Sequence, residues 1–429
     1  MTQSVFSVVA DVGPGRAAEL AATLATIGAA PTSNTVLPFG RLGGLHFASL
    51  VLADGLERPK LIFESNVDGT VAGWLATLAA DAGGGLDALF RGSPGYPGSG
   101  DPDRVQAWLA GRVVQPGAFH IGATGRTVGR IRQEQRLHDQ IAGFLGAEDE
   151  AGRLQGLGQA EVRAQVQTFV RSEPSLAWAG AKPPPRESLR DKVGHRLRAA
   201  AVVATALVLA PVLVPVVAVG YVVLRAKERT DPVRQHPPEP AHIRRLEETE
   251  DLGVFEGVDG PRLLAQNHLS SVIPLKPGMF RAALLPLVLF VLNLLARIVF
   301  TKGKLGNIPS IHFAHWSLID EGRHLVFLSN FDGSWESYLG DFIDKAAVGL
   351  TAVWSNTKDF PRTRQLVRQG AADGPRFRQW ARGSQCSTQA WYSAYPELTM
   401  TAIDNNSAIR EGLFTRLDDD GTETWLRRL

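Results

Sequence analysis

The chain has 429 residues, of which 44% are hydrophobic, 21% charged and 8% aromatic, and these fractions are close to the average of soluble globular proteins. Collagen, coiled-coil rods, disordered chains and disulfide-rich miniproteins are therefore excluded, and the length allows roughly two to four domains. The net charge of +2 argues against a dedicated nucleic-acid binder, and the single cysteine, Cys386, excludes an intramolecular disulfide and a multi-cysteine metal site.

The start of the chain predicts a strand, a turn and a helix. Residues 5–12 favour a strand, Gly13-Pro-Gly15 is typical of a turn, and residues 16–27 place Ala and Leu at helical spacing. The first residues contain neither the basic region nor the apolar run of a secretory signal, so we expect folding to begin in the cytoplasm.

Two long segments of the chain repeat each other. Residues 60–70 are Lys-Leu-Ile-Phe-Glu-Ser-Asn-Val-Asp-Gly-Thr, and residues 324–334 are His-Leu-Val-Phe-Leu-Ser-Asn-Phe-Asp-Gly-Ser. His46-Phe-Ala also matches His312-Phe-Ala, and the correspondence continues as far as residues 118–120 and 390–392. Because so many ordered matches seldom arise by chance, we interpret the chain as an internal duplication.

Each copy predicts the element order β-α-β-β-α-β of a ferredoxin-like unit. In the first copy, periodicity indicates strands at 46–52, 60–66 and 86–90 and a helix at 71–80. In the second copy, it indicates strands at 267–274, 311–319, 325–330 and 350–354 and helices at 280–300 and 335–346. Further helices are expected at 104–109 and 377–382, and a further strand at 389–392. The predicted fold class is α+β, with both units in one pseudo-twofold barrel and an apolar helical insertion between them.

The domain boundaries follow from this division. We expect a first repeat over 1–150, a helical and Pro-rich connector over 151–197, an apolar segment over 198–226, a linker over 227–262 and a second repeat over 263–429.

This order of elements resembles the dimeric α+β barrel superfamily, in which two ferredoxin-like units pack sheet to sheet. The superfamily includes dye-decolourising peroxidases and chlorite dismutases, which bind haem, and antibiotic-type monooxygenases, which often need no cofactor. The resemblance lies in element order over about two-thirds of the chain. The Gly-x-x-Asp-Gly signature of the haem peroxidases is replaced by Ser-Asn-Val-Asp-Gly at 65–69 and Ser-Asn-Phe-Asp-Gly at 329–333. The second half also resembles a bacterial family of unassigned function.

Two apolar segments set this chain apart from an ordinary soluble protein, although its mean hydropathy is only −0.03. Residues 199–224 form a run of 26 residues without a charge, long enough to span a membrane, and residues 282–296 form a second run of 15. A buried core helix is the alternative for the first run; a short span, an interfacial helix and a core helix all remain open for the second.

The topology of the first run follows from the duplication. Both halves can share one barrel only if they lie on the same side of the membrane, so a single crossing is excluded. Either the second run crosses back, or Pro211 and Pro215 split the first run into a re-entrant hairpin, which we favour over a Pro-kinked straight span. Arginines flank both ends of the run, which predicts that both ends lie on the cytoplasmic face.

The candidate site residues lie mainly in the second half, which has more polar and aromatic residues than the first at corresponding positions. The candidate catalytic residues are His312, Asp332, Arg362 and Arg364, and the candidate ligand-binding residues are Asn330, Trp335, Trp354, Asn356, Trp391 and Tyr392. If haem is present, as the resemblance implies, His46 or His312 would be its ligand, since imidazole commonly ligates haem iron. No His-x-x-x-His or His-Glu-x-x-His spacing occurs, so no dedicated zinc site is expected.

Each of these residues also has a purely structural interpretation. Strand histidines are more often core residues than ligands, and Asn-x-Asp-Gly-Thr/Ser is explained by a turn followed by a helix N-cap. Arg362 and Arg364 suit either a carboxylate or phosphate ligand or a basic surface next to lipid headgroups. Asp404, Asn405 and Asn406 suit either the cap of a short helix or a solvated turn, and we expect the turn.

Two functions are compatible with this pattern. One is a membrane-anchored oxidoreductase that acts on an apolar or lipid-derived substrate. It would resemble a peroxidase or an oxygenase, and one form of this hypothesis makes it haem-dependent. The other is a non-catalytic lipid-binding or scaffold protein at the membrane. In both, membrane lipid is the expected partner, homo-oligomers are compatible with the sequence, and nucleic acid is not an expected partner.

Overall fold

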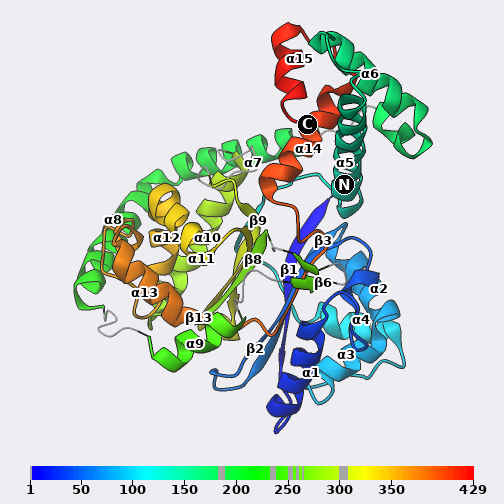
Figure 1. Cartoon of the computed structure of the whole chain (residues 1–429). Coiled ribbons are helices and arrows are strands. Elements are labelled where there is room, and N and C mark those ends of the chain that lie inside the picture. The colour runs from blue at the N-terminus through cyan, green and yellow to red at the C-terminus, as the bar shows by residue number, and fades with distance from the viewer. Residues whose placement is uncertain are drawn as a thin grey trace.

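Two five-stranded antiparallel sheets face each other, and helices cover their outer faces (Figure 1). The computed structural model describes residues 2–181, 189–231, 238–249, 255–257, 260–262, 265–298 and 308–429. The predicted α+β class is confirmed.

The first sheet has the strand order β14-β2-β3-β1-β4. Its strands are β1 (Gln3–Asp11), β2 (Leu45–Ala53), β3 (Lys60–Asp68), β4 (Val113–Val114) and β14 (Ala390–Ser393). The central strand β3 pairs along its whole length with β1, from Lys60 opposite Asp11 to Asp68 opposite Gln3, and its other edge pairs with β2. The strands predicted at 5–12, 46–52 and 60–66 are confirmed.

The second sheet has the order β13-β8-β10-β9-β5. Its strands are β5 (Ala118–Ile121), β8 (Gln266–Pro274), β9 (Ile311–Ile319), β10 (His324–Asp332) and β13 (Gln385–Cys386). Here β10 takes the central place that β3 has in the first sheet, with His324 opposite Pro274 of β8 and Ile319 of β9. The strands predicted at 267–274, 311–319 and 325–330 are confirmed.

Each half of the chain contributes one short strand to the sheet of the other half. From the C-terminal half, β14 pairs with β2, and from the N-terminal half, β5 pairs with β9. The contact after β5 is close: a Cβ added to Gly122 would lie 2.3 Å from the carbonyl oxygen of Ile311. The two halves are therefore interlocked through backbone hydrogen bonds.

Helices pack on the outer face of each sheet. The first sheet is covered by α1 (Ala17–Ala29), α2 (Val71–Asp81), α3 (Gly83–Phe90) and α4 (Pro102–Ala110); the second by α10 (Met279–Ile298), α11 (Trp335–Asp341), α12 (Ala347–Trp354) and α13 (Gly374–Ser384). The strands predicted at 86–90 and 350–354 are wrong, because both segments are helical, in α3 and α12. A short, wholly apolar run has no period that distinguishes a buried strand from a buried helix.

The motif Asp-Gly-Thr/Ser forms the predicted turn and cap in both halves. Gly69 and Gly333 have φ of 87° and 82°, a conformation that glycine adopts without steric cost. Thr70 accepts a hydrogen bond from the amide of Gly73 at the start of α2, and Ser334 accepts one from Ser337 at the start of α11, both at 3.2 Å.

A helical subdomain stands at the top of Figure 1. It contains α5 (Val128–Glu150), α6 (Gln159–Ser172), a short 3-10 segment (Pro174–Gly180), α14 (Met400–Leu413) and α15 (Asp419–Leu426), which pack around Leu137, Val166 and Trp425. Residues 404–406 lie within α14, so the expected solvated turn is wrong. Asn406 is buried and donates to Gln135 Oε1 at 2.6 Å, so it acts in helix packing.

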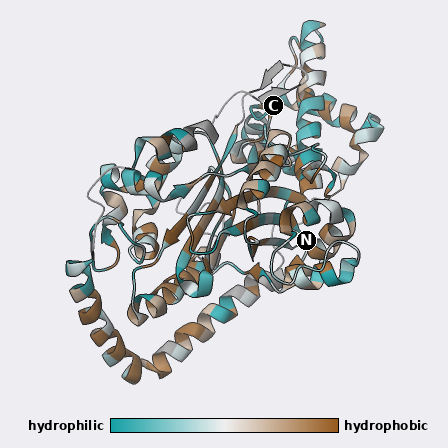
Figure 2. Ribbon diagram, turned by 90° about the horizontal axis from the view of Figure 1, so that it is seen from below, coloured by the Kyte–Doolittle hydropathy of each residue, from teal (hydrophilic) through white to brown (hydrophobic). Residues whose placement is uncertain are grey.

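An apolar arm connects the halves and consists of α7 (Leu189–Val208) and α8 (Ala210–Thr230), with a bend at Leu209. Figure 2 shows it as a largely brown, bent pair of helices that stands away from the body. The bend directly precedes Pro211, which lies in the first turn of α8, where proline is tolerated, whereas Pro215 lies inside α8. The predicted division of residues 199–224 therefore occurs at 209, before both prolines.

The remaining elements are α9 (Pro240–Thr249), the strand pair β6 (Phe255–Gly257) and β7 (Gly260–Arg262), and the hairpin β11 (Thr363–Arg364) and β12 (Arg368–Gln369). The predicted linker over 227–262 overlaps the end of α8 and all of α9, and part of it lies outside the described residues. By length and composition, two helical segments among the described residues could cross a membrane, Ala210–Thr230 and Met279–Ala296.

Candidate functional site

The facing surfaces of the two sheets form three layers, because every second residue of a strand points to the same side. One end is apolar and is filled by Val51, Ala53, Ile62, Ile319, Val326 and Leu328. The middle layer is polar and buried, with Ser7, Ser49, Glu64, His268, Ser270 and His315. The other end is a cluster of rings: Phe47, Phe313, Trp391, Tyr395, His46 and His312.

Glu64 is the centre of the polar layer, and its side chain is 0% exposed. Its Oε2 accepts a hydrogen bond from the Ser49 hydroxyl at 2.8 Å, and its Oε1 accepts from the amides of Asn66 at 2.9 Å and Asn330 at 3.3 Å. The bond from Asn330 crosses from β10 to β3 and so joins the two sheets. A buried carboxylate is tolerated only with such partners, so these donors hold Glu64 in place.

Two buried histidines flank this carboxylate. His315 Nδ1 lies 3.6 Å from Glu64 Oε1, and His268 Nε2 lies 3.8 Å from Glu64 Oε2. Burial lowers the pKa of both histidines, and the charge of Glu64 opposes that shift. Both distances exceed hydrogen-bond length, so Glu64 acts on the two histidines through its charge.

The polar layer continues through hydrogen bonds of both histidines. His268 lies 2.9 Å from Asn330 Oδ1 through Nδ1 and 2.9 Å from Ser270 Oγ through Nε2, and His315 Nε2 lies 3.3 Å from Ser7 Oγ. The indole of Trp391 also donates to Asn330 Oδ1, at 2.8 Å. Two of the predicted ligand-binding residues, Asn330 and Trp391, therefore meet inside the molecule.

His46 and His312 occupy equivalent irregularities in the two sheets. The register of β2 against β3 shifts at His46, and that of β9 against β10 shifts at His312, so each histidine lies at a β-bulge. His46 Nε2 lies 3.0 Å from Asp68 Oδ1, and His312 Nε2 lies 2.7 Å from Asp332 Oδ1. The predicted catalytic residues His312 and Asp332 are thus in direct contact.

Both aspartates also connect the sheets to the helical subdomain. The second carboxylate oxygen of each accepts a hydrogen bond from the first amide of a helix. Asp68 accepts from Val128 of α5 at 3.0 Å, and Asp332 accepts from Met400 of α14 at 2.8 Å. A carboxylate at a helix start is stabilised by the helix dipole, so each histidine–aspartate pair has a complete structural explanation.

The two histidines were the candidate ligands for haem, and their surroundings do not fit that group. Both ring nitrogens of His46 are engaged, Nε2 with Asp68 and Nδ1 with the Tyr395 hydroxyl at 2.7 Å. His312 Nδ1 is buried without a hydrogen-bond partner, but the rings of Phe47 and Tyr395 pack 5.2 and 6.1 Å from the imidazole. Iron could reach neither histidine in this arrangement.

The other predicted residues lie elsewhere. Trp335 and Trp354 belong to the core between the second sheet and its helices, and Tyr392 belongs to the corresponding core of the first sheet. Arg362 and Arg364 are exposed on and beside the hairpin β11–β12. The ten predicted site residues therefore do not form one site.

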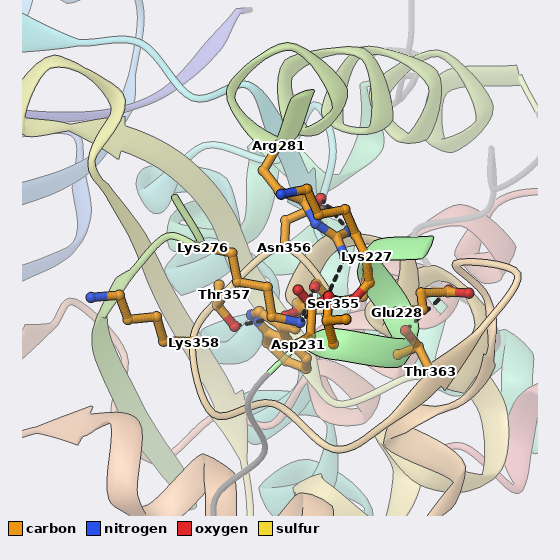
Figure 3. A network of polar contacts seen from close by, with 12 residues as sticks. Lys227, Glu228, Asp231, Lys276, Arg281, Ser355, Asn356, Thr357, Lys358 and Thr363 are labelled. Atoms are coloured by element: carbon orange, nitrogen blue, oxygen red, sulfur yellow. Dashed lines mark hydrogen bonds and ion pairs between the residues drawn. The ribbon is translucent and has the colours of Figure 1, made fainter. Parts of the chain in front are cut away.

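A second polar network fastens the end of the apolar arm to the body (Figure 3). Asp231, just after α8, accepts from Lys276 Nζ at 2.9 Å and from Arg281 of α10 at 2.6 Å. Lys276 also donates to the carbonyl of Ser355, and Arg281 donates to Asn356 Oδ1 at 3.2 Å. Burial lowers the pKa of Lys276, and the hydrogen bond and charge of Asp231 oppose that shift. Asn356 thus helps to hold the arm.

Glu228 makes the second attachment of α8. Its carboxylate accepts from the amides of Gln365 at 3.0 Å and Leu366 at 2.7 Å and from the Thr363 hydroxyl at 3.2 Å. Gln365 and Leu366 have φ of 59° and 67°, which non-glycine residues seldom adopt. Glu228 therefore holds the strained turn of the hairpin β11–β12 against the last turns of α8.

A cleft of about 630 Å³ opens between the two sheets beside the apolar layer, and charged residues line it. Lys60 contacts Asp11 and lies 3.9 Å from Asp320, and Arg323 lies 3.0 Å from Asp320. The basic residues of the lining (Arg58, Lys60, Arg112 and Arg323) are matched in number by acidic ones (Asp11, Glu57, Asp320 and Glu321), so the cleft does not present an excess of one charge that would select a ligand.

The candidate residues selected from the sequence include neither Glu64 nor His268 nor His315. One signal was present for Glu64: it lies between Ile62 and Asn66 on the inward face of β3, where the second repeat has Leu328.

Comparisons with known proteins add no relative: no family model, no curated protein and no solved structure matches the chain.

Proposed function

We propose that this chain is a membrane-anchored lipid-binding protein, held at the cytoplasmic face by its apolar arm. One observation carries the proposal: the arm and α10 expose many large hydrophobic side chains, together called the apolar face. Its members are Val203, Leu207, Val208, Leu209, Val212, Leu213, Val214, Val216, Val217, Val219, Tyr221, Val222, Leu287, Phe290, Val291 and Leu295.

The helices that carry the apolar face are in contact with one another. α7 packs on α10, and Gly220 of α8 lies beside Phe280 of α10. In the windows of highest hydropathy, only 6% of the α8 segment and 22% of the α10 segment is buried. Monomeric soluble proteins rarely expose apolar patches larger than a few hundred Å², so this surface needs a partner.

The composition of the face favours lipid over a protein partner. Residues 199–224 are almost wholly Ala, Val, Leu and Pro, with only Thr205 and Tyr221 carrying a polar side-chain group. Protein interfaces are instead enriched in aromatic residues, Met and Arg. Tyr221 lies at the C-terminal limit of the run, where tyrosine is favoured at the membrane–water boundary.

The lengths of the two pieces support a re-entrant arm. At 1.5 Å per residue, the apolar part of α7 is about 15 Å long and that of α8 about 22 Å, whereas the hydrocarbon core is about 30 Å thick. Arg196 and Arg198 precede the run and Arg225 follows it, and both sheets lie on one side of the arm. Under the positive-inside rule, this side is the cytoplasm.

Vesicle flotation of the full chain tests the proposal. The triple variant Val212→Asp, Val216→Asp, Val219→Asp puts three charges on the apolar face, each at a cost of about 2.5–3.5 kcal/mol in a membrane, and should abolish flotation. The control, Ala22→Asp, Ala25→Asp, Ala72→Asp, puts the same charges on exposed positions of α1 and α2 and should float like the parent. Equal flotation of both variants would contradict the proposal.

Cysteine labelling tests the topology. Single cysteines at Thr2 and Asp420 should be labelled from the same side of the membrane, since each belongs to the sheets or the subdomain joined to them. Cys386 should give little background, because burial raises its thiol pKa to about 12 and the thiolate is the reactive form. Labels on opposite sides would exclude the re-entrant arm.

The oxidoreductase hypothesis stays a prediction and has its own test. The absorption spectrum and the lipid content of the purified protein should show bound lipid and no Soret band if our proposal is correct. A Soret band would overturn the assignment in favour of the haem-dependent hypothesis.

We also propose that the two halves descend from one ferredoxin-like unit. Support comes from the order β4-β1-β3-β2 in one sheet and β13-β8-β10-β9 in the other, and from the matching bulges at His46 and His312. The short strands exchanged between the sheets, β5 and β14, are the segments that align in the sequence repeat.

A further inference from the structure

The end of the apolar arm is surrounded by basic side chains that have no ion-pair partner among the described residues. We propose that these side chains, Lys227, Arg229, Arg362, Arg364 and Arg368, form a basic collar that binds anionic phospholipid headgroups. This inference rests on the proposed function and names the lipid class that the anchored protein prefers.

The collar lies at the level where headgroups would be. The apolar run of α8 ends at Leu224, and Lys227 and Arg229 follow within the next two turns. The hairpin β11–β12 is held at the same level, because Gln365 donates to the Tyr221 hydroxyl at 3.0 Å and Glu228 binds the amides of the turn. The hairpin arginines therefore stand beside the boundary between apolar and charged residues.

The arrangement within the hairpin is unfavourable without an anion. Arg364 and Arg368 are directly opposite each other across the β11–β12 pair, both exposed, and like charges in this position destabilise a hairpin. The two carboxylates at the end of α8 are already used: Glu228 contacts Arg225 and the turn, and Asp231 contacts Lys276 and Arg281. An anionic surface supplies the missing countercharge.

The loss of membrane affinity expected from removing the collar arginines follows from the charge of each residue. A basic residue near an anionic membrane surface contributes about a factor of five in affinity, so removing three should lower affinity about 100-fold. The preference should weaken with salt, because exposed charges are screened over about 8–10 Å at physiological ionic strength.

The experiment compares binding of the full chain to phosphatidylcholine vesicles and to vesicles in which a third of the lipid is phosphatidylglycerol. The parent should bind both and prefer the anionic ones. The variant Arg362→Gln, Arg364→Gln, Arg368→Gln should lose about 100-fold in affinity for anionic vesicles and keep its affinity for phosphatidylcholine. The matched control removes three exposed arginines on α4, α5 and after α14: Arg104→Gln, Arg136→Gln, Arg416→Gln.

Each outcome distinguishes this inference from the function on which it rests. Binding of the parent to neither vesicle type would overturn membrane anchoring itself. Equal binding to both types, or equal losses in the variant and the control, would overturn the collar alone.

A comparison of salts distinguishes lipid headgroups from free phosphate. Sodium phosphate should release the protein no better than sodium chloride of equal ionic strength. Stronger release by phosphate would assign the arginines to a free-phosphate site and overturn the lipid assignment. Unchanged thermal unfolding of the variant confirms that its fold is intact.

Discussion

Glu64, His268 and His315 bring three titratable side chains together where water does not reach. Two hydrogen bonds cross between the sheets here, from Asn330 to Glu64 and between His315 and Ser7, so the polar layer helps to specify how the sheets face each other. Because these side chains are buried, their protonation states contribute to the free energy of unfolding.

We predict that the protein loses stability as the pH falls from about 7 to about 5. The folded-state pKa of His268 and of His315 is lowered by burial, so their contribution is present above the unfolded-state pKa of about 6.5 and is lost below it. Each buried neutral histidine should cost up to about 1.4 kcal/mol per pH unit below that value. Urea unfolding of the detergent-solubilised protein at several pH values measures this.

The matched variants for this prediction are a double and a single substitution. His268→Gln, His315→Gln should flatten the pH dependence. His324→Gln should leave most of it, because His324 is only partly buried, and the charge and hydrogen bond of Asp320, 3.1 Å away, oppose the lowering of its pKa by burial. An equally steep dependence in the double variant would show that other groups are responsible.

At the scale of elements, the exchange of β5 and β14 depends on close backbone approaches. Gly122 lies against Ile311, while Gly146, exposed in α5, has open space around it. Gly122→Ala should therefore destabilise the protein by about 2 kcal/mol or more through overpacking, and Gly146→Ala should stabilise it by about 0.5–1 kcal/mol through helix propensity. Denaturant unfolding of both variants tests the pair, and equal effects would refute the close approach.

The attachment of α8 is a second property of elements. Glu228→Ala removes the acceptor of three hydrogen bonds, which together contribute about 2–4 kcal/mol to the attachment of α8. Because the detached state becomes more populated, trypsin should cleave after Arg225, Lys227 and Arg229 about 100-fold faster. The control Glu336→Ala affects an exposed carboxylate 3.5 Å from Arg382 and should leave cleavage unchanged. Slow cleavage in both variants would mean that Asp231 alone holds the arm.

The long strands and the short helices differ in how well the sequence predicts them. Paired runs separated by a turn identified the long strands, although β3 and β10 are buried on both faces, whereas α3 and α12 are short apolar runs without a usable period. The sequence repeat aligns His46 with His312, but their bulges and their aspartate partners depend on strand register. The layer around Glu64 combines residues from β1, β2, β3, β8, β9 and β10, which no local pattern brings together.

For the whole molecule, the exchanged strands make each half incomplete by itself. We predict that residues 1–231 and 238–429, produced separately in detergent, do not unfold cooperatively, because each sheet lacks one strand. Produced together, they should co-purify and regain one cooperative transition, measured by circular dichroism. A cooperative transition in either fragment alone would contradict this prediction.

The position of β14 near the end of the chain also fixes an order of events during synthesis. The edge of β2 stays uncovered until residue 393 has left the ribosome, which is long after α7 and α8 have emerged. An uncovered strand edge is a template for aggregation. Translation therefore presents the arm to its surroundings before the body is complete, and the nascent chain carries an open sheet edge during that interval.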